Sequence, residues 1–302
     1  MKSPTLLYTN EDDHGYTNPS FRYLLGFQPS SGYMLLTQKK LHIILNPLYF
    51  EKLSTLDIKH IKKIIGKKEI HTHLLDQPLT NILKKITKSS TLTLEDSVPL
   101  NFYQSLEKNY SLSTTKNIFA EARKIKHSQE IKCIRKAIEM IQKVYADIET
   151  LNHKGKIYGK TELEIRQYII ERIFAHGGEG EGFDSIVAFG SNSAIPHHTA
   201  GSTLIQEGVL LIDMGALYQG YSSDFSRTFW VKKPSIFGTK KVQNKELYKE
   251  FLQVKSIVAE AQKRAMKKSK KGNAFFEIDA AAREYIIQQG YGEEFIHSTG
   301  HG

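Results

Sequence analysis

The chain has few cysteines and lacks long apolar runs. The first argues against a disulfide-bonded protein, and the second argues against a membrane-spanning protein. Cys133 is the only cysteine among 302 residues, so no disulfide can form within the chain, which fits a reducing compartment. No apolar stretch reaches the roughly 20 residues of a membrane helix. The N-terminal segment MKSPTLLYTNEDDHGY lacks the apolar core of a signal peptide. We therefore expect a cytoplasmic protein without a membrane span.

Nucleic-acid-binding motifs are also missing, although the chain carries a net charge of +10. Its lysines are spread along stretches with helical spacing, such as KHIKKIIGKK and RAMKKSKKGN. There is no zinc-finger spacing, no aromatic–basic RNA signature and no basic region leading into heptads. The charge therefore indicates solvated faces and no specific nucleic-acid partner.

The first part of the chain predicts a small α/β domain, to which we assign residues 1–122. Tyr33–Thr37 and Leu41–Leu45 have the pattern of a β-hairpin, residues 56–65 have helical apolar spacing, and Thr91–Leu94 resembles a further strand. Near Arg123 the pattern changes to that of a long helix, which sets the domain boundary.

The remaining residues, 123–302, predict an α+β domain with helices on one side of a largely antiparallel sheet. Ser128 is a suitable N-cap for a long helix with one apolar stripe. A second helix, residues 161–176, ends at Gly177-Gly178. Further elements are expected at residues 186–190 (strand), 245–268 and 275–289 (helices), and near Phe295 (strand). The stripe consists of Ile131, Ile134, Ile138, Ile141, Tyr145 and Ile148.

Asp213 and Asp224 lie in two apolar, glycine-containing segments, VLLIDMGALYQ and GYSSDFSRTFW, which predict one β-hairpin. A two-residue turn at Gln219-Gly220 would pair position 213 with position 226. Both carboxylates would then project from one face as diagonal neighbours. The run Val209–Ile212 is typical of a strand buried on both faces, where an unpaired carboxylate is costly. Metal ligation is therefore the leading interpretation; surface acids neutralised by Arg227 are the weaker alternative.

Histidine is the other informative residue type. Pro196-His197-His198 precedes the Asp213 strand, and His297 and His301 lie in the terminal HSTGHG. The spacing of four would suit helical metal ligands, but the glycines favour extended or turning backbone. For any lone histidine a structural role is the ordinary alternative. The neighbouring glycines and the two aspartates favour a functional role for these histidines.

These segments, in this order, resemble the proline-specific metallopeptidases of the pita-bread fold, the Xaa-Pro aminopeptidases and Xaa-Pro dipeptidases. The similarity includes GSNSAIPHH, LLIDMGALYQGYSSDFSRTF and HSTGHG, and extends to RKIKHSQEIKCIRKAIE, GKTELEI and FDSIVAFGSNSAIPH. FRYLLGFQPSSGYMLLT resembles the creatinase-like N-terminal domain of the same family. The resemblance therefore implies a pita-bread α+β domain behind a creatinase-like α/β domain.

The resemblance also implies the site residues. It makes Asp213, Asp224 and His301 metal ligands, with Asp224 bridging two divalent ions. His197 would steady the substrate, and His297 would be a second active-site histidine. The implied reaction is hydrolysis of an Xaa-Pro bond by a metal-activated hydroxide. Oxygen-rich ligation suits Mn²⁺ first, with Co²⁺ or Zn²⁺ as alternatives. The implied partners are a proline-containing peptide and a second copy of the chain in a homodimer.

One feature departs from the family pattern. Two further glutamate ligands follow the HSTGHG motif in the family, whereas this sequence stops at Gly302. We therefore expect a C-terminally truncated chain that is inactive alone. Two other functions stay open: a non-catalytic pita-bread module that binds peptides or proteins, which the intact acids disfavour, and a methionine aminopeptidase, which residues 1–120 disfavour.

Overall fold

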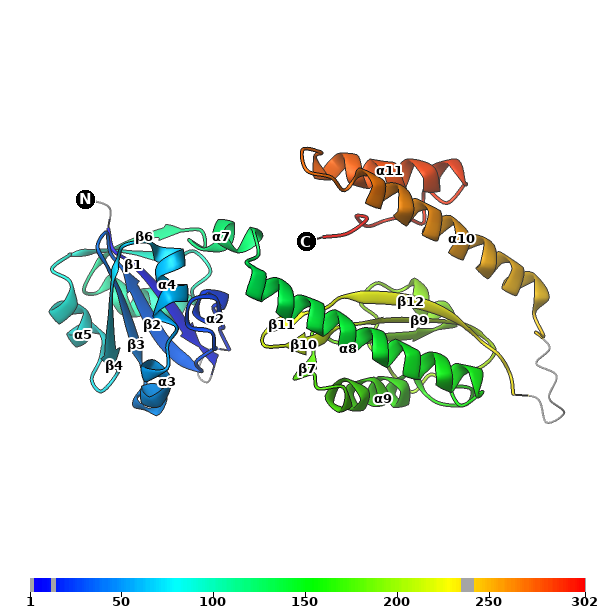
Figure 1. The fold of residues 1–302 in the computed structure, drawn as a ribbon, viewed down its shortest axis with the longest axis horizontal. Helices are drawn as coiled ribbons and strands as arrows, with labels where there is room; N and C mark the ends of the chain where they lie inside the picture. The colour runs from blue at the N-terminus through cyan, green and yellow to red at the C-terminus, as the bar shows by residue number, and fades with distance from the viewer. Residues whose placement is uncertain (1–2, 12–14, 235–241, 302) are drawn as a thin grey trace. The chain divides into compact units, whose positions relative to one another are not determined.

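The structure is a computed structural model that describes residues 3–11, 15–234 and 242–301. It divides into two compact units, Met1–Ser128 and Gln129–Gly302 (Figure 1). The division falls slightly later than the sequence-based boundary between residues 122 and 123. The two units are described separately below.

The first unit is built on a mixed six-stranded sheet with the strand order β4-β3-β2-β1-β5-β6 (Figure 1). The predicted hairpin is confirmed: β2 and β3 pair antiparallel, with Leu36 opposite Leu41. The strand expected at residues 91–94 is also confirmed, as β5. The strands are β1 (Thr5–Asn10), β2 (Ser31–Leu36), β3 (Lys40–Leu45), β4 (Glu69–Leu74), β5 (Thr91–Glu95) and β6 (Ser111–Thr115).

Helices cover both faces of this sheet because successive strand residues alternate between two apolar clusters. Leu7, Met34 and Ile43 pack with α2 and α4, whereas their neighbours in the strands, such as Leu6 and Leu35, pack with α5 and α6. The helices of this unit are α2 (Pro19–Leu25), α3 (Phe50–Ser54), α4 (Ile58–Ile65), α5 (Leu79–Ile86), α6 (Leu100–Glu107) and α7 (Ala120–Lys124).

The second unit begins with two helices that pack on one side of antiparallel strands, as predicted (Figure 1). Helix α8 is Ser128–His153 and helix α9 is Glu162–Ala175. One sheet has the order β12-β9-β8 and a smaller one the order β11-β10-β7. Their strands are β7 (Gly180–Glu181), β8 (Ile186–Phe189), β9 (Gly208–Met214), β10 (Ala216–Tyr218), β11 (Tyr221–Ser222) and β12 (Phe225–Val231).

The apolar stripe predicted for α8 is only partly right. Its second half is buried as expected at Ile141, Tyr145 and Ile148, but Ile131 is exposed. In the first half the buried residues are Glu130, Cys133, Ala137 and Met140, so this part of the face is not a continuation of the isoleucine stripe.

The first half of α8 contacts the hairpin turn. Cys133 Sγ lies 3.4 Å from Gln219 Oε1 at the hairpin turn. Larger side chains at these positions would hold the helix away from the turn.

Helices α10 (Lys245–Lys268) and α11 (Phe275–Gln288) form a pair with a small core of its own, made of Ile257, Ala261, Ala265, Ala282 and Ile286. Both helices confirm the sequence prediction. None of the helices within the described ranges is long and apolar enough to cross a membrane.

The strand expected near Phe295 is wrong, because the segment after α11 has turns and irregular backbone. Arg283 of α11 donates hydrogen bonds to the backbone carbonyls of Phe295 (2.8 Å) and His297 (2.7 Å). These carbonyls are therefore occupied by a side chain instead of a neighbouring strand. The Phe295 ring packs against the α10–α11 pair.

Candidate metal centre

The hairpin that carries the two aspartates has the predicted register. Tyr218 pairs with Tyr221 around a two-residue turn, and Asp213 pairs with Ser226 further along. Gln219 and Gly220 both have positive φ, 48° and 77°, as a tight hairpin turn with the twist of the strands requires. The sequence therefore predicted the pairing of the acidic segment correctly.

Gly215 is the residue that lets the two strands come together beside Asp224. A Cβ atom at Gly215 would collide with the backbone carbonyl of Ser223 and the ring of Phe183. The small sheet is closed at the same point, since Gly182 N–H donates to the Gly215 carbonyl at 2.8 Å. A side chain at this position would push Asp224 away from the strand that carries Asp213.

The prediction that the Asp213 strand is buried on both faces is wrong. Leu210, Ile212 and Met214 are fully buried against α8 and α9, whereas the alternate residues, Asp213 among them, are partly exposed. The period of the strand places α8 and α9 on one face only. Asp213 therefore lies on the half-exposed face, where an ion or a substrate can reach it.

The Asp213 carboxylate accepts a 2.7 Å hydrogen bond from the Ser226 hydroxyl directly opposite. Burial raises the pKa of Asp213 above its usual value; the hydrogen bond from Ser226 opposes this rise and the charge of Asp224 adds to it. His197 and His301 lower the same pKa through their charges. Three of the other predicted site residues, Asp224, His197 and His301, thus lie within electrostatic range of Asp213.

His301 comes closest to a predicted partner. Its Nε2 atom lies 3.2 Å from Oδ2 of Asp224, and both side chains are largely exposed. His197 is exposed on the loop before β9 and has a positive φ of 54°, which is uncommon for a residue with a side chain. Such a conformation persists only where the surroundings hold the loop in place.

His297 has different surroundings. Its Nδ1 atom lies 2.8 Å from the Ser298 carbonyl, and its ring meets Phe295 edge-on at 5.0 Å. Within the described residues, these contacts stay in the C-terminal segment, and its own carbonyl is bound by Arg283 of α11. An active-site role for His297 therefore stays a prediction.

The donor set of Asp213, Asp224 and His301 suits a divalent cation chemically, because it offers carboxylate oxygens and one imidazole. Within residues 3–11, 15–234 and 242–301, however, no three His, Cys, Asp or Glu side chains are arranged to hold a metal ion. The Asp224–His301 pair is close enough to share one ion, and Asp213 is bonded to Ser226 beside it. The full ligand set stays a prediction.

Three residues around the site were missed by the sequence reasoning. Ser226 positions Asp213, and the Tyr145 hydroxyl lies 2.9 Å from the Ile212 carbonyl and 2.6 Å from the Phe225 carbonyl, so it ties β9 to β12. Glu162 is fully buried at the start of α9 and binds the loop that carries His197. The predicted hairpin register already made Ser226 the partner of Asp213. The contacts of Tyr145 and Glu162 could not be predicted from the spacing of residues in the sequence.

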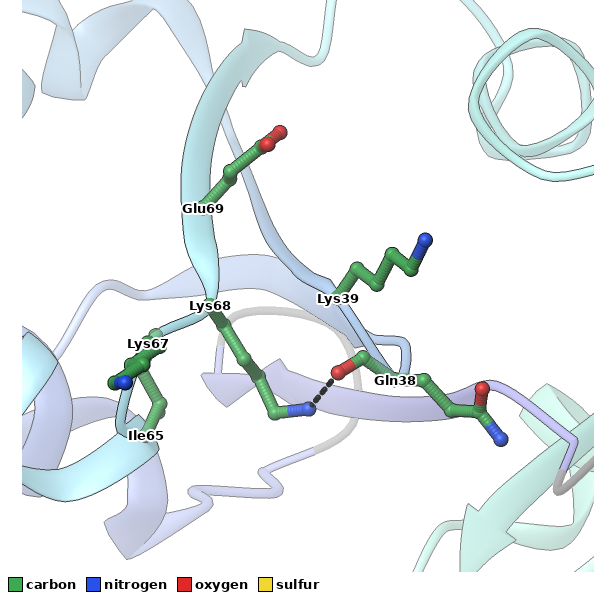
Figure 2. Close-up of a pocket in the computed structure, with 6 residues that line it drawn as sticks. All are labelled: Gln38, Lys39, Ile65, Lys67, Lys68 and Glu69. Atoms are coloured by element: carbon green, nitrogen blue, oxygen red, sulfur yellow. Dashed lines mark hydrogen bonds between the residues drawn. The ribbon is translucent and has the colours of Figure 1, made fainter.

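Two hollows among the described residues lie away from these side chains. One of about 440 Å³ in the first unit is lined by six residues, and Figure 2 shows Lys68 directed at the Gln38 carbonyl there. Another of about 300 Å³ lies beside Trp230, Tyr248 and Phe251 in the second unit. Neither contains a predicted site residue, so the candidate centre is defined by the hairpin.

Comparison with known families agrees with this architecture. Residues 132–302 match the metallopeptidase family M24, and residues 15–125 match the creatinase/prolidase N-terminal domain. The chain therefore belongs to the M24 metallopeptidases, with a pita-bread domain preceded by a creatinase-like domain. It is a hydrolase of the peptidase class.

Individual relatives are similar to the chain over most of its length. The chain is 33% identical to an Xaa-Pro dipeptidase of Pyrococcus horikoshii over 94% of its own length and 74% of the relative. Among solved structures, an Xaa-Pro dipeptidase from Bacillus anthracis has a TM-score of 0.81 at 29% identity, covering 99% of this chain and 77% of the other. The prolidase from Pyrococcus horikoshii OT3 has a TM-score of 0.79 at 29% identity, with 99% and 77% covered.

Proposed function

We propose that this metallopeptidase hydrolyses the bond before proline, either in dipeptides or at the N-terminus of longer peptides. The names of its relatives support the Xaa-Pro specificity. The observation that carries the proposal is the hairpin register, which sets Asp213 opposite Ser226, with Asp224 two residues before Ser226 and directly ahead of β12.

In this proposal Asp213, Asp224 and His301 hold two divalent ions together with the two further glutamates that the family uses, with Mn²⁺ preferred to Co²⁺ or Zn²⁺. Such ions would polarise the scissile carbonyl and lower the pKa of a water molecule. The bond before proline has no N–H, so a site that acts on the carbonyl loses nothing when that donor is missing. Ser226 keeps the Asp213 carboxylate oriented, and His197 would donate to the substrate oxygen where charge develops.

The function is tested with two substrates that differ at one position. The assay uses a version of the protein that also carries the two further glutamates expected after the HSTGHG motif. After chelator treatment this version receives Mn²⁺, Co²⁺ or Zn²⁺ and then a peptide with proline or alanine in second place, and the released amino acid is measured. We expect metal-dependent release from the proline peptide and little from the alanine peptide. Equal release from both would contradict Xaa-Pro specificity.

The same samples test the alternative function. Peptide binding without metal binding or hydrolysis would favour a non-catalytic binding module. We include a homodimer and a cytoplasmic location in the proposal; light scattering of the purified protein measures the first, and cell fractionation the second.

A further inference from the structure

Glu162 is a buried carboxylate of the second unit whose two oxygens both accept hydrogen bonds. It is fully buried at the first position of α9. Its Oε1 atom accepts hydrogen bonds from the Phe189 N–H (2.8 Å) and the Asn192 side chain (2.9 Å). Its Oε2 atom accepts from His198 Nε2 (2.9 Å) and the Gly201 N–H (3.3 Å). One side chain thus holds the loop between β8 and β9 at several points along its length.

The carboxylate is ionised in this position. Burial alone would raise the pKa of Glu162, but the hydrogen bonds from Asn192, His198 and the two backbone N–H groups outweigh it and lower the pKa. A carboxylate with four donors is well compensated for the loss of water. Removing its charge would leave buried donors without an acceptor, which is costly.

The two adjacent histidines of the loop have different surroundings. His198 is largely buried and points to Glu162, whereas His197 is exposed and lies in electrostatic range of Asp213. His197 also has the positive φ of 54°, which persists only where the surroundings impose it. The bond from His198 to Glu162 fixes the residue next to this strained position.

We infer that Glu162 and His198 form a positioning pair that holds His197 in place beside Asp213. The catalytic role of His197 in this inference rests on the proposed function. The hydrogen bonds that hold the loop do not depend on that function. Glu162 and His198 act through His197 and do not themselves touch the substrate. Sequence reasoning assigned no role to either residue.

The first test measures the loop itself. Hydrogen–deuterium exchange of residues 189–201 is compared in the wild-type protein and in Glu162→Gln, His198→Ala and His198→Gln. We expect faster exchange in Glu162→Gln and His198→Ala, and near wild-type protection in His198→Gln, because the glutamine amide can still donate to Glu162. Unchanged exchange in the first two variants would overturn the inference.

Glu164→Gln is the matched control. Glu164 lies in the same first turn of α9 and bonds to Thr161 in a capping box, but it is exposed and does not touch the loop. We expect this variant to lose some helix stability without faster exchange of residues 189–201. Equal acceleration in Glu162→Gln and Glu164→Gln would show a general effect of α9 and contradict the positioning role.

The second test is a double-mutant cycle on turnover. His198→Ala should lower kcat about tenfold with KM and metal content little changed, and this loss should disappear in a His197→Ala background. Equal losses in both backgrounds would show that the pair does not act through His197. Turnover is measured in the version that carries both further glutamates; absence of Xaa-Pro hydrolysis by that version would sink the proposed function, while the exchange experiment would still decide the loop inference.

Discussion

The Nε2 atom of His301 lies 3.2 Å from Oδ2 of Asp224, so the segment after α11 reaches the turn that precedes β12. Both side chains are largely exposed, and such pairs contribute at most about 1 kcal/mol to stability. We therefore expect Asp224→Asn to change the free energy of unfolding by less than about 1 kcal/mol in metal-free protein. Urea denaturation measures this, and a much larger loss would indicate a structural role instead of ligation.

His197→Ala should lower turnover by about 10²–10³, the usual effect of losing one donor to a developing negative charge. The metal content should be unchanged, because His197 is expected to face the substrate. Metal analysis of the purified variant checks this. A variant that loses its metal would make His197 a ligand.

Gly215→Ala should disrupt the hairpin at the candidate centre. The added methyl group would collide with the backbone carbonyl of Ser223 and the ring of Phe183, and we expect a loss of at least about 2 kcal/mol of stability. Gly201→Ala is the matched control, because a Cβ atom there meets nothing within 4 Å. Similar thermal stability of the two variants would contradict the close approach at Gly215.

Tyr145→Phe should loosen β9 from β12, because the hydroxyl of Tyr145 bonds to the carbonyls of Ile212 and Phe225. The expected cost is about 1–2 kcal/mol for a buried hydrogen-bonding group. Chemical denaturation gives the stability, and amide exchange in β9 and β12 shows whether the loss is local. Unchanged amide exchange in β9 and β12 would mean that the backbone hydrogen bonds between the two strands fix their pairing without Tyr145.

We expect the stability of the first unit to decrease as the pH falls, because of a buried histidine. His42 is 4% exposed, and its Nδ1 lies 2.9 Å from His73 Nε2. Burial and the neighbouring His73, His71 and Lys40 lower the pKa of His42 from 6.5 to about 4. The unfolded chain then binds the proton more readily, so this contribution is complete above about pH 6.5 and is lost as the pH falls toward 4.

His42→Gln tests that dependence, since the amide can still bond to His73 but does not titrate. Urea denaturation between about pH 5 and pH 7 should give a shallower slope for the variant than for the wild type. Parallel slopes would assign the pH dependence to other groups.

The sequence predicted the hairpin well because its signals are local. A Gln-Gly turn and the period of two in the strands were enough to pair Asp213 with Ser226. The closing glycines of α9 are equally local, and Gly177 has a φ of 89°.

Features that depend on distant partners were not predicted. Glu162 looks like an ordinary first-turn acid, and only the folded chain shows its bonds to Phe189, His198 and Gly201. The strand expected near Phe295 failed for the same reason, since Arg283 of α11 takes the carbonyl that a strand would use. The apolar pattern of the sequence indicated that these segments pack in the fold, but it did not indicate which residues they contact.

The most direct test of the account is a Mn²⁺ titration by calorimetry of the chelator-treated protein and of the Asp213→Asn/Asp224→Asn double variant. Ser226→Ala serves as a control that weakens the orientation of Asp213 but keeps both carboxylates. The account predicts saturable binding by the wild type, weaker binding by Ser226→Ala and none by the double variant. Equal binding by the wild type and the double variant would contradict it.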